Sequence, residues 1–357
     1  MEKLGNLSVK SELEKFDILS MTQGEIESAV KNLGQPTYRA KQIWGWLHQK
    51  HVQTFADMPN LPKSMRDELD SAYRIASVVA EKKLTSKTDG TVKYLFSLHD
   101  STLIESVLME YSHGNTVCIS TQAGCRMGCT FCASAEGGLV RNLTAGEMCI
   151  QVYAAARDCS RVGGIVLMGC GEPLDNFDQT MRFIELITHK EGINIGQRHI
   201  TLSTCGLVPQ IHELAEMKLQ ITLAISLHGA TDDVRQQLVP IAKRYPINDL
   251  ISACRNYIEK TNRRITFEYT LADGINDNIS HAKDLTKLLR GLNCHVNLIP
   301  INKARGEFSP STRKNTQEFV NILEKGRIQT TVRRSLGSDV NAACGQLRSE
   351  AKTHDKK

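Results

Sequence analysis

Apolar positions in the N-terminal part of the chain recur at the three- and four-residue spacing typical of helices. Thr22 and Glu25 form a capping box that should open one helix, and Gly34 should close it. A second helix is expected over residues 38–49, and a third follows it. The pattern therefore predicts a small helical accessory domain over residues 1–75.

The pattern changes over residues 76–112 to an alternation of apolar and polar positions, which is typical of strands. Asp89 and Gly90 form a turn signal inside this stretch, because glycine readily adopts the positive φ that a tight turn needs. We therefore expect a short β extension, built around a hairpin, between the helical domain and the rest of the chain.

Short β-branched runs alternate with helical patterns over residues 113–348, which we expect to form the core domain. Thr144 and Glu147 form a second capping box, which should open one of the helices. Repeated strand–helix units predict an α/β fold with a parallel sheet, either open or curled into a barrel, and residues 349–357 should form a polar tail. The predicted strands cover residues 116–120, 164–168, 199–202, 221–226, 265–270, 296–299 and 330–333.

The composition excludes several classes of protein. With 41% hydrophobic and 23% charged residues among 357, the chain can bury a sizeable core, so it is not a disordered or low-complexity protein. Aromatic residues make up only 5%, which argues against binding by aromatic stacking. The net charge of +5 permits an anionic partner without requiring one.

The 11 cysteines are more informative than the charge. The charged N-terminal residues lack the apolar segment of a secretory signal, and no apolar run is long enough to span a bilayer. We therefore expect a cytoplasmic protein that does not enter a membrane. In a reducing compartment, cysteines serve metal binding or catalysis more often than disulfides, and an odd number excludes complete pairing.

Three of the cysteines, Cys125, Cys129 and Cys132, follow the first predicted core strand at the spacing C-x3-C-x2-C. Thiolates hold iron–sulfur clusters, and three ligands would leave one iron of a 4Fe–4S cluster open to a substrate. A zinc site is the alternative, but structural zinc needs four protein ligands. Cys118 could be the fourth, yet a residue within the strand is poorly placed to reach the same ion. The spacing therefore favours the iron–sulfur cluster.

This motif resembles the signature of radical S-adenosylmethionine (SAM) enzymes, whose partial (β/α)6 barrel holds a 4Fe–4S cluster. In those enzymes the methionine part of SAM chelates the open iron, and reductive cleavage yields a 5′-deoxyadenosyl radical. Gly171 and Glu172, after the second core strand, resemble the element that holds the SAM amino group. The resemblance fits the chemistry, because a carboxylate accepts hydrogen bonds from an ammonium.

Longer blocks resemble one subfamily, the RlmN/Cfr family of RNA adenine methyltransferases, from about residue 16 to residue 348. Their order and spacing agree over nearly the whole chain, including part of the helical domain, which resembles the family's RNA-recruiting domain. The matching blocks include residues 38–42, 118–125, 141–144, 201–204, 224–228, 239–241, 297–302 and 339–347.

The resemblance implies roles for individual residues. The three clustered cysteines would bind the 4Fe–4S cluster, and Cys344 would carry a methyl group that it receives from one SAM, while a second SAM is cleaved. Cys118 would resolve the covalent protein–RNA adduct by taking the ring proton and forming a transient disulfide with Cys344. Glu105 would accept a proton beside Cys118. The residues implied to line the SAM site are Gly171, Glu172, Ser203, Ser226, Leu227, His228 and Asn302.

RlmN-type enzymes methylate adenine at C2 and Cfr-type enzymes at C8, and Pro173 and Pro300 favour the C2 type here. The resemblance implies the adenine at position 2503 of 23S rRNA and the adenine at position 37 of tRNA as substrates. It also implies an electron donor such as flavodoxin, and we expect a monomer. The alternatives are a Cfr-type C8 methyltransferase and, in a different class, a non-catalytic iron–sulfur sensor that binds RNA. Candidate contacts to RNA phosphates are Arg39, Lys41, Arg263, Arg264, Arg333 and Arg334.

Overall fold

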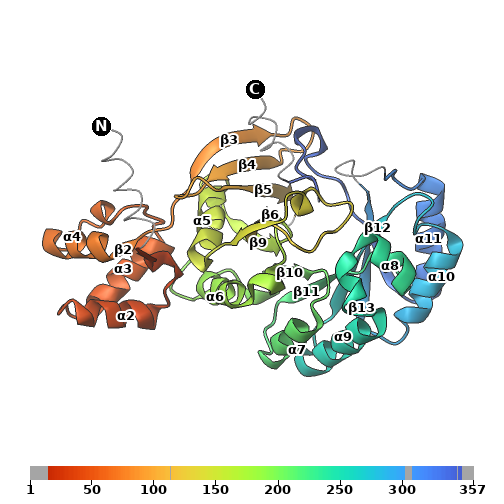
Figure 1. The fold of residues 1–357 in the computed structure, drawn as a ribbon. Helices are drawn as coiled ribbons and strands as arrows, with labels where there is room; N and C mark the ends of the chain where they lie inside the picture. Colours follow the sequence, from red (N-terminus) through yellow and green to blue (C-terminus); the bar gives the residue numbers. More distant parts are fainter. Residues whose placement is uncertain (1–14, 113, 302–307, 344, 348–357) are drawn as a thin grey trace.

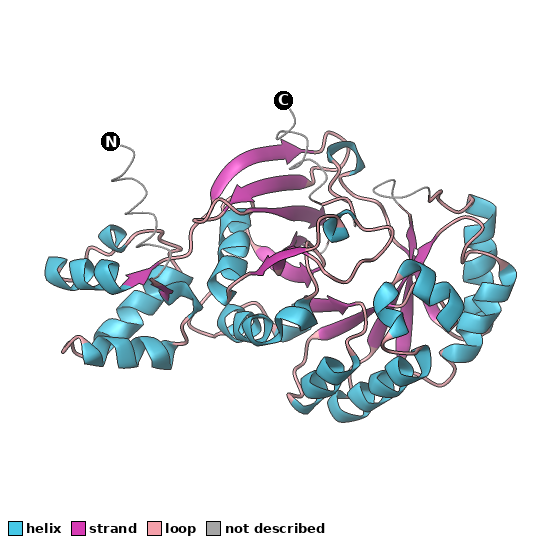
Figure 2. Ribbon diagram, in the orientation of Figure 1, coloured by secondary structure: helices cyan, strands magenta, loops and turns pink. Residues whose placement is uncertain are grey.

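The structure, a computed structural model, describes residues 15–112, 114–301, 308–343 and 345–347. Ten strands of these residues form one curved sheet, in the order β14-β13-β12-β11-β10-β9-β6-β5-β4-β3 (Figures 1 and 2). Their bounds are β3 Val79–Thr85, β4 Val92–Ser97, β5 Leu103–Tyr111, β6 Gly114–Cys118, β9 Val162–Leu167, β10 Ile200–Thr204, β11 Thr222–Ser226, β12 Ile265–Leu271, β13 Cys294–Pro300 and β14 Gln329–Val332.

Within this sheet, the seven neighbouring strands β6, β9, β10, β11, β12, β13 and β14 are parallel, and helices join them in order along the chain. Six strands with the helices that follow them build the partial (β/α)6 barrel expected of the chain, and β14 adds a further parallel strand. Figure 1 shows most of these helices on the outer side of the curved sheet. The helices are α5 Ala145–Ala156, α6 Phe177–Thr188, α7 Val208–Glu216, α8 Asp232–Leu238, α9 Ile247–Thr261, α10 Ile279–Leu288 and α11 Arg313–Lys325.

The β extension is part of the same sheet. Strands β3, β4 and β5 are antiparallel, and β5 pairs with β6 so that Val107 lies opposite Cys118. The hairpin expected at Asp89 and Gly90 joins β3 to β4, and Gly90 has a φ of 75°. The extension therefore prolongs the sheet at its first core strand, and its position as a separate domain over residues 76–112 stays a prediction.

The helical region consists of α2 (Gln23–Asn32), α3 (Tyr38–His48) and α4 (Lys63–Ala72). Thr22 and Glu25 form the expected capping box, and Gly34, with a φ of 66°, lies just beyond the end of α2. The capping box predicted at the start of α5 is also present. None of the helices among the described residues has the length and apolar character needed to cross a bilayer.

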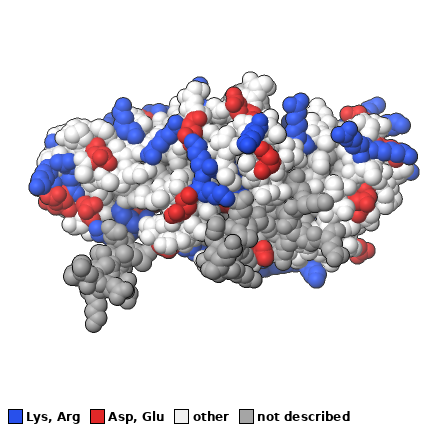
Figure 3. Space-filling view, turned by 90° about the horizontal axis from the view of Figure 1, so that it is seen from above, with Lys and Arg blue, Asp and Glu red and all other residues white. Residues whose placement is uncertain are grey.

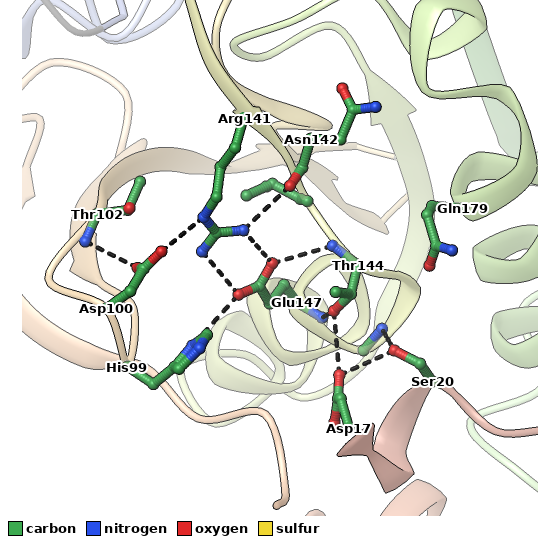
Figure 4. Close-up of polar contacts among 12 residues, drawn as sticks. Asp17, Ser20, His99, Asp100, Thr102, Arg141, Asn142, Thr144, Glu147 and Gln179 are labelled. Atoms are coloured by element: carbon green, nitrogen blue, oxygen red, sulfur yellow. Dashed lines mark hydrogen bonds and ion pairs between the residues drawn. The ribbon is translucent and has the colours of Figure 1, made fainter. Parts of the chain in front are cut away.

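A buried polar network joins the helical region to the barrel (Figure 4). Asp17 accepts hydrogen bonds from the Oγ atoms of Ser20 at 2.8 Å and Thr144 at 3.0 Å. Ser20 Oγ in turn accepts one from the backbone N–H of Gly146, at the start of α5. Asp17 also accepts a hydrogen bond from the backbone N–H of Ala76. The segment from Asp17 to Ser20 is therefore fixed to the first turn of a barrel helix.

The same helix is joined to the β extension by Arg141 (Figure 4). Its guanidinium binds both carboxylate oxygens of Glu147, at 2.8 and 2.9 Å, and Asp100 at 2.6 Å. Burial alone would raise the pKa of Glu147, but hydrogen bonds from His99 and Arg141 outweigh it and lower that pKa to about 2. The helical region, the extension and the barrel thus meet at one charged helix terminus.

Candidate active site

One cavity of about 960 Å³, partly open to solvent, lies at the carboxyl ends of the barrel strands. This is where active sites of such barrels lie, because the loops that follow successive strands converge there. Eight residues implied by the resemblance line it: Cys125, Cys129, Cys132, Gly171, Glu172, Ser203, Ser226 and His228. They come from the loops and ends of β6, β9, β10 and β11, so distant parts of the sequence converge on a single cavity.

The cysteine loop is held by hydrogen bonds from its own backbone and from a neighbouring helix. The N–H of Cys125 donates to Gly138, and the N–H of Cys132 donates to Cys129. Thr130 donates from its backbone to the carbonyl of Leu238, the last residue of α8, at 3.0 Å. The carboxyl end of α8 therefore supports the loop between the second and third cysteines.

Two thiols of this loop, those of Cys125 and Cys129, have raised pKa values, which favours their protonated form. Burial is the main cause that raises the pKa of Cys125 to about 12, and the charges of Glu172 and Cys132 add to it. Burial and the two neighbouring thiols likewise raise the pKa of Cys129. Thiolates in this environment need a positively charged centre to stabilise them, which an iron–sulfur core provides.

The arrangement suits a cluster better than a single ion. Within the described part of the chain, no three cysteine, histidine or carboxylate side chains are grouped as one metal ion requires. A 4Fe–4S cluster needs its thiolates to be spaced apart around it, because each thiolate binds a different iron atom. Three thiols that line one cavity without meeting at a point satisfy that requirement.

Gly169 and Gly171 are required by packing between two protein segments. A Cβ atom on Gly169 would lie 2.6 Å from the carbonyl oxygen of Ile119, and one on Gly171 would lie 2.6 Å from Cβ of Gln122. Gly171 also has a φ of 109°, which disfavours other residues. The loop after β9 thus lies directly against the segment that leads from β6 to the cysteines.

The carboxylate of Glu172 is buried and fixed by backbone donors. It accepts hydrogen bonds from the N–H groups of Leu174 at 3.0 Å and Cys205 at 2.8 Å. Burial raises the pKa of Glu172, and these hydrogen bonds oppose the rise. A carboxylate held in this way has lone pairs left to receive an ammonium group at the cavity wall.

Ser203 and Ser226 lie side by side, with 3.3 Å between their Oγ atoms, at the ends of two adjacent strands. Leu227 follows, but its side chain is fully buried and does not line the cavity. Only its backbone could therefore contribute to a ligand site. Asn302 lies outside the described residues.

His228 lines the cavity in its neutral form. Burial lowers its pKa to about 3, with a contribution from the charge of Arg235. Its Nδ1 accepts a hydrogen bond from the backbone N–H of Thr270 at 3.0 Å, so the proton of the neutral ring is on Nε2. The residue has a φ of 55°, a strained conformation of the kind found at functional sites.

Glu105 on β5 and Cys118 on β6 lie on one face of the sheet, where the β extension joins the barrel. Cys118 is opposite Val107 in the β5–β6 pairing, and Glu105 is two residues along the same strand, so the two side chains are diagonal neighbours. Cys118 packs in a small cluster with Met109 and Leu347. It does not line the cavity that the three cysteines share, which argues against it as a fourth ligand.

Cys344 lies outside the described residues, but its neighbours in sequence are placed. Gly345 lines the main cavity, and its carbonyl accepts a hydrogen bond from the backbone of Ala133 at 2.8 Å. Ala343 lines a second, smaller cavity, which shares Ile299 and Arg333 with the first. The C-terminal segment therefore contacts both cavities and, through Leu347, the cluster around Cys118.

Three buried charged residues of the site were not predicted from the sequence. Lys93 forms an ion pair with Glu105, Arg235 lies beside the cysteine loop, and Glu268 lines the cavity. Burial raises the pKa of Glu268, which accepts a hydrogen bond from Asn297 at 2.9 Å. The sequence did contain one signal for Glu268, because a glutamate inside a strand predicted to be buried is unusual.

The candidate RNA contacts are far apart in the structure. Arg333 lines both cavities and Arg334 lines the smaller one. Arg263 and Arg264 precede β12 and lie at the amino ends of the parallel strands, whereas Arg333 follows the carboxyl end of β14. Arg39 donates to the carbonyl of Asn60 in the helical region. On the face shown in Figure 3, basic side chains are spread from one end to the other with acidic ones among them.

The fold and the cavity define a radical SAM enzyme, and comparisons with known proteins agree. The family model of the radical SAM superfamily matches residues 119–286, and that of the ribosomal RNA large subunit methyltransferase N-terminal domain matches residues 16–75. A solved radical SAM methyltransferase from Sphaerobacter thermophilus is 45% identical, with a TM-score of 0.90 over 94% of this chain and 100% of that one.

The chain belongs to the RlmN family. A relative in Alkaliphilus oremlandii, described as "Probable dual-specificity RNA methyltransferase RlmN", is 55% identical over 94% of this chain and 98% of its own. A relative of the same description in Lachnoclostridium phytofermentans is 51% identical over 95% and 96%. The resemblance seen in the sequence blocks is thus confirmed.

Proposed function

We propose that the protein methylates C2 of adenine in RNA, at position 2503 of 23S rRNA and position 37 of tRNA. One observation carries the proposal: three thiols and five of the residues implied to bind SAM line a single cavity, and the cavity also contains Gly345 from the C-terminal segment. The dual-specificity description of relatives that align over nearly the full chain supports both substrates. Pro300, typical of the C2 type, lines the same cavity.

Cys125, Cys129 and Cys132 are proposed to hold a 4Fe–4S cluster, and SAM to lie against Glu172, Ser203, Ser226 and His228, with the backbone of Gly171 and Leu227 and with Asn302. When bound, the cluster supplies the electron that cleaves SAM. The buried carboxylate of Glu172 can accept hydrogen bonds from the SAM amino group, and the paired serine hydroxyls can bind polar groups of the nucleoside.

Cys344 is proposed to accept a methyl group from one SAM, so that each turnover uses two SAM molecules. Its sulfur then carries the one-carbon unit to the adenine ring, which is not nucleophilic enough at carbon to attack a sulfonium. The thiolate of Cys118 is proposed to take the ring proton, pass it to Glu105 and then attack the sulfur of Cys344. The bond between that sulfur and the one-carbon unit breaks, the carbon takes up a proton to become the methyl group of the product, and a transient disulfide remains for a reductant to open. The packing of Cys118 against Leu347 supports this pairing.

Glu105 is proposed as the proton acceptor beside Cys118. Its carboxylate is buried and lies 3.0 Å from the ammonium group of Lys93. Ser120 donates a hydrogen bond to the backbone carbonyl of Glu105 at 2.7 Å, which fixes the strand at this position. The diagonal position of Glu105 relative to Cys118 in the β5–β6 pairing supports this role.

The target adenine has to leave its stack to reach this cavity. The smaller cavity, lined by Tyr111, Arg333 and Arg334, adjoins the main one and can receive part of the nucleotide, because its arginines suit a phosphate and its apolar wall suits a base. We propose that the chain acts as a monomer in the cytoplasm, where rRNA, tRNA and a donor such as flavodoxin are available.

The test is to reconstitute the protein anaerobically, supply SAM, a reductant and an rRNA fragment or tRNA, and identify modified nucleosides by mass spectrometry. The proposal predicts 2-methyladenosine in both RNAs. Finding 8-methyladenosine would show a C8 enzyme, and finding a cluster but no methyladenosine would favour a sensor. Either result would contradict the proposed function.

A further inference from the structure

Arg235 is a cation that lies fully inside the protein. Its side chain has 0% exposure, and no carboxylate among the described residues forms an ion pair with it. Nη2 donates to the carbonyl of Cys205 at 2.5 Å, but Nε and Nη1 have no hydrogen-bond partner in the described part of the chain. A buried charge of this kind is costly unless an opposite charge lies nearby.

The surrounding backbone is shaped to accommodate this side chain. A Cβ atom on Gly206 would lie 3.0 Å from Nη2 of Arg235, and one on Gly229 would lie 2.7 Å from the backbone nitrogen of the same residue. Gly206 has a φ of 105°, which disfavours other residues. The loop after β10 therefore leaves room for the guanidinium, and the loop after β11 lets the backbone of α8 approach closely.

Arg235 lies on the helix that supports the cysteine loop. It is on α8, whose last carbonyl accepts a hydrogen bond from Thr130, next to Cys129. Its Nη2 donates to the carbonyl of Cys205, and Cys205 lines the same cavity as the three cysteines. Electrostatically, Arg235 interacts favourably with Cys205, Cys129 and Asp232. The buried charge of Arg235 therefore lies next to the cysteine loop.

We propose that Arg235 is the built-in counter-charge of the iron–sulfur cluster held by Cys125, Cys129 and Cys132, and that it raises the reduction potential of that cluster. Three thiolates outweigh the positive charge of the oxidised iron–sulfur core, and reduction adds one more electron. A fixed buried cation therefore stabilises the reduced form more than the oxidised form. Arg235 is a positioning residue in this account, since it acts through the cluster.

The inference rests on the proposed cluster site, and the test keeps the two apart. The full chain is reconstituted anaerobically, its iron and sulfide are counted, and the cluster is titrated with dithionite as the one-electron donor without SAM or RNA. Electron paramagnetic resonance reports the reduced cluster at each potential. No bond forms or breaks in this titration, so the midpoint reflects only the stability of the added electron.

Arg235→Met keeps much of the side-chain volume and removes the charge, and Arg235→Lys keeps the charge. The Arg235→Met variant should have an equilibrium constant for one-electron reduction of the cluster at least tenfold smaller, which is a shift of the midpoint by about 59 mV to lower potential. The Arg235→Lys variant should keep a midpoint potential near that of the wild type. Lys243→Met, which removes an exposed charge just beyond α8, should leave the midpoint unchanged. Arg235→Gln replaces the methionine variant if that variant does not fold.

A normal cluster whose midpoint is the same in Arg235→Met, Lys243→Met and the wild type would overturn the inference and leave the cluster site intact. It would mean that Arg235 only fixes the Cys205 loop. A wild-type protein that assembles no cluster would overturn the proposed function itself. A midpoint that falls in Arg235→Met and is kept in Arg235→Lys supports the inference.

Discussion

The ammonium group of Lys93 lies 3.0 Å from the carboxylate of Glu105, and both side chains are only 2% exposed. Lys93 also donates to the carbonyl of Asn341 at 3.1 Å. One buried cation on β4 therefore joins the proposed proton acceptor on β5 to the C-terminal segment. The charge of Glu105 and the position of that segment are coupled through this side chain.

Lys93→Met should strongly destabilise the protein. It removes the cation from a buried ion pair, and breaking one side of such a pair costs about 3–5 kcal/mol. Urea unfolding should show this loss. Adding Glu105→Gln to the same chain should recover part of it, because the buried negative charge is then removed as well. Lys87→Met, at an exposed position on the same extension, is the control and should change little.

Gly146→Ala should loosen the junction between the helical region and the barrel. A Cβ atom at this position would overlap Oδ2 of Asp17 and crowd Oγ of Ser20. Overpacking of a close-packed site costs about 1–3 kcal/mol, which a shift in the urea midpoint would reveal. Gly24→Ala, where a Cβ meets nothing within 4 Å, is the matched control. Equal stability of the two variants would refute the packing argument.

His48 should make the protein less stable as the pH falls below about 6.5. Burial lowers its pKa to about 3, with smaller effects from His51 and His189, whereas the unfolded value is about 6.5. The unfolded chain therefore takes up a proton first, and stability is lost as the pH falls from about 6.5 toward 3. At pH 5 the free energy of unfolding is lower than at neutral pH by about 2 kcal/mol as a result.

The measurement is urea unfolding at pH 7 and at pH 5 for the wild type and His48→Gln. The wild type should lose about 2 kcal/mol more than the variant between these two values. His212→Gln, which changes an exposed histidine, should behave like the wild type. An equal loss in the wild type and in His48→Gln would show that His48 is not the group responsible.

Cys129→Ser should abolish the iron–sulfur cluster. The wild type should bind about four iron atoms per chain after anaerobic reconstitution, because a 4Fe–4S cluster contains three iron atoms bound by thiolates and one open iron atom. The variant should retain only a small part of that iron and lose the visible absorption of the cluster. Cys159→Ser, a half-buried cysteine that does not line the cavity, should keep both. A loss of iron in both variants would point to general unfolding.

The order of helices and strands could be predicted because its signals are local. The capping box at Thr22 and Glu25 and the one at Thr144 and Glu147 lie within four residues, and both are confirmed. The three cysteines are also close in sequence, and their spacing placed them on one loop. The path of the extension was less predictable, because its junction with the barrel depends on the pairing of β5 with β6.

The buried charges were missed because their partners are far away along the chain. Lys93 is 248 positions from Asn341, and Arg235 is 30 positions from Cys205. A sequence pattern shows only that each is a basic residue, for which the surface is the usual position. The burial of these side chains follows from the packing of the C-terminal segment and of α8, which no local signal reveals.

The most direct test of the account is the covalent protein–RNA species that Cys118→Ala should accumulate. The variant, reconstituted with cluster and supplied with SAM, reductant and tRNA, should stop after the carbon bridge forms. Digestion and mass spectrometry should then find an adenine joined to the peptide that contains Cys344, and Cys159→Ala should give free methylated RNA. Normal turnover by Cys118→Ala, or an adduct on any other residue, would contradict the account.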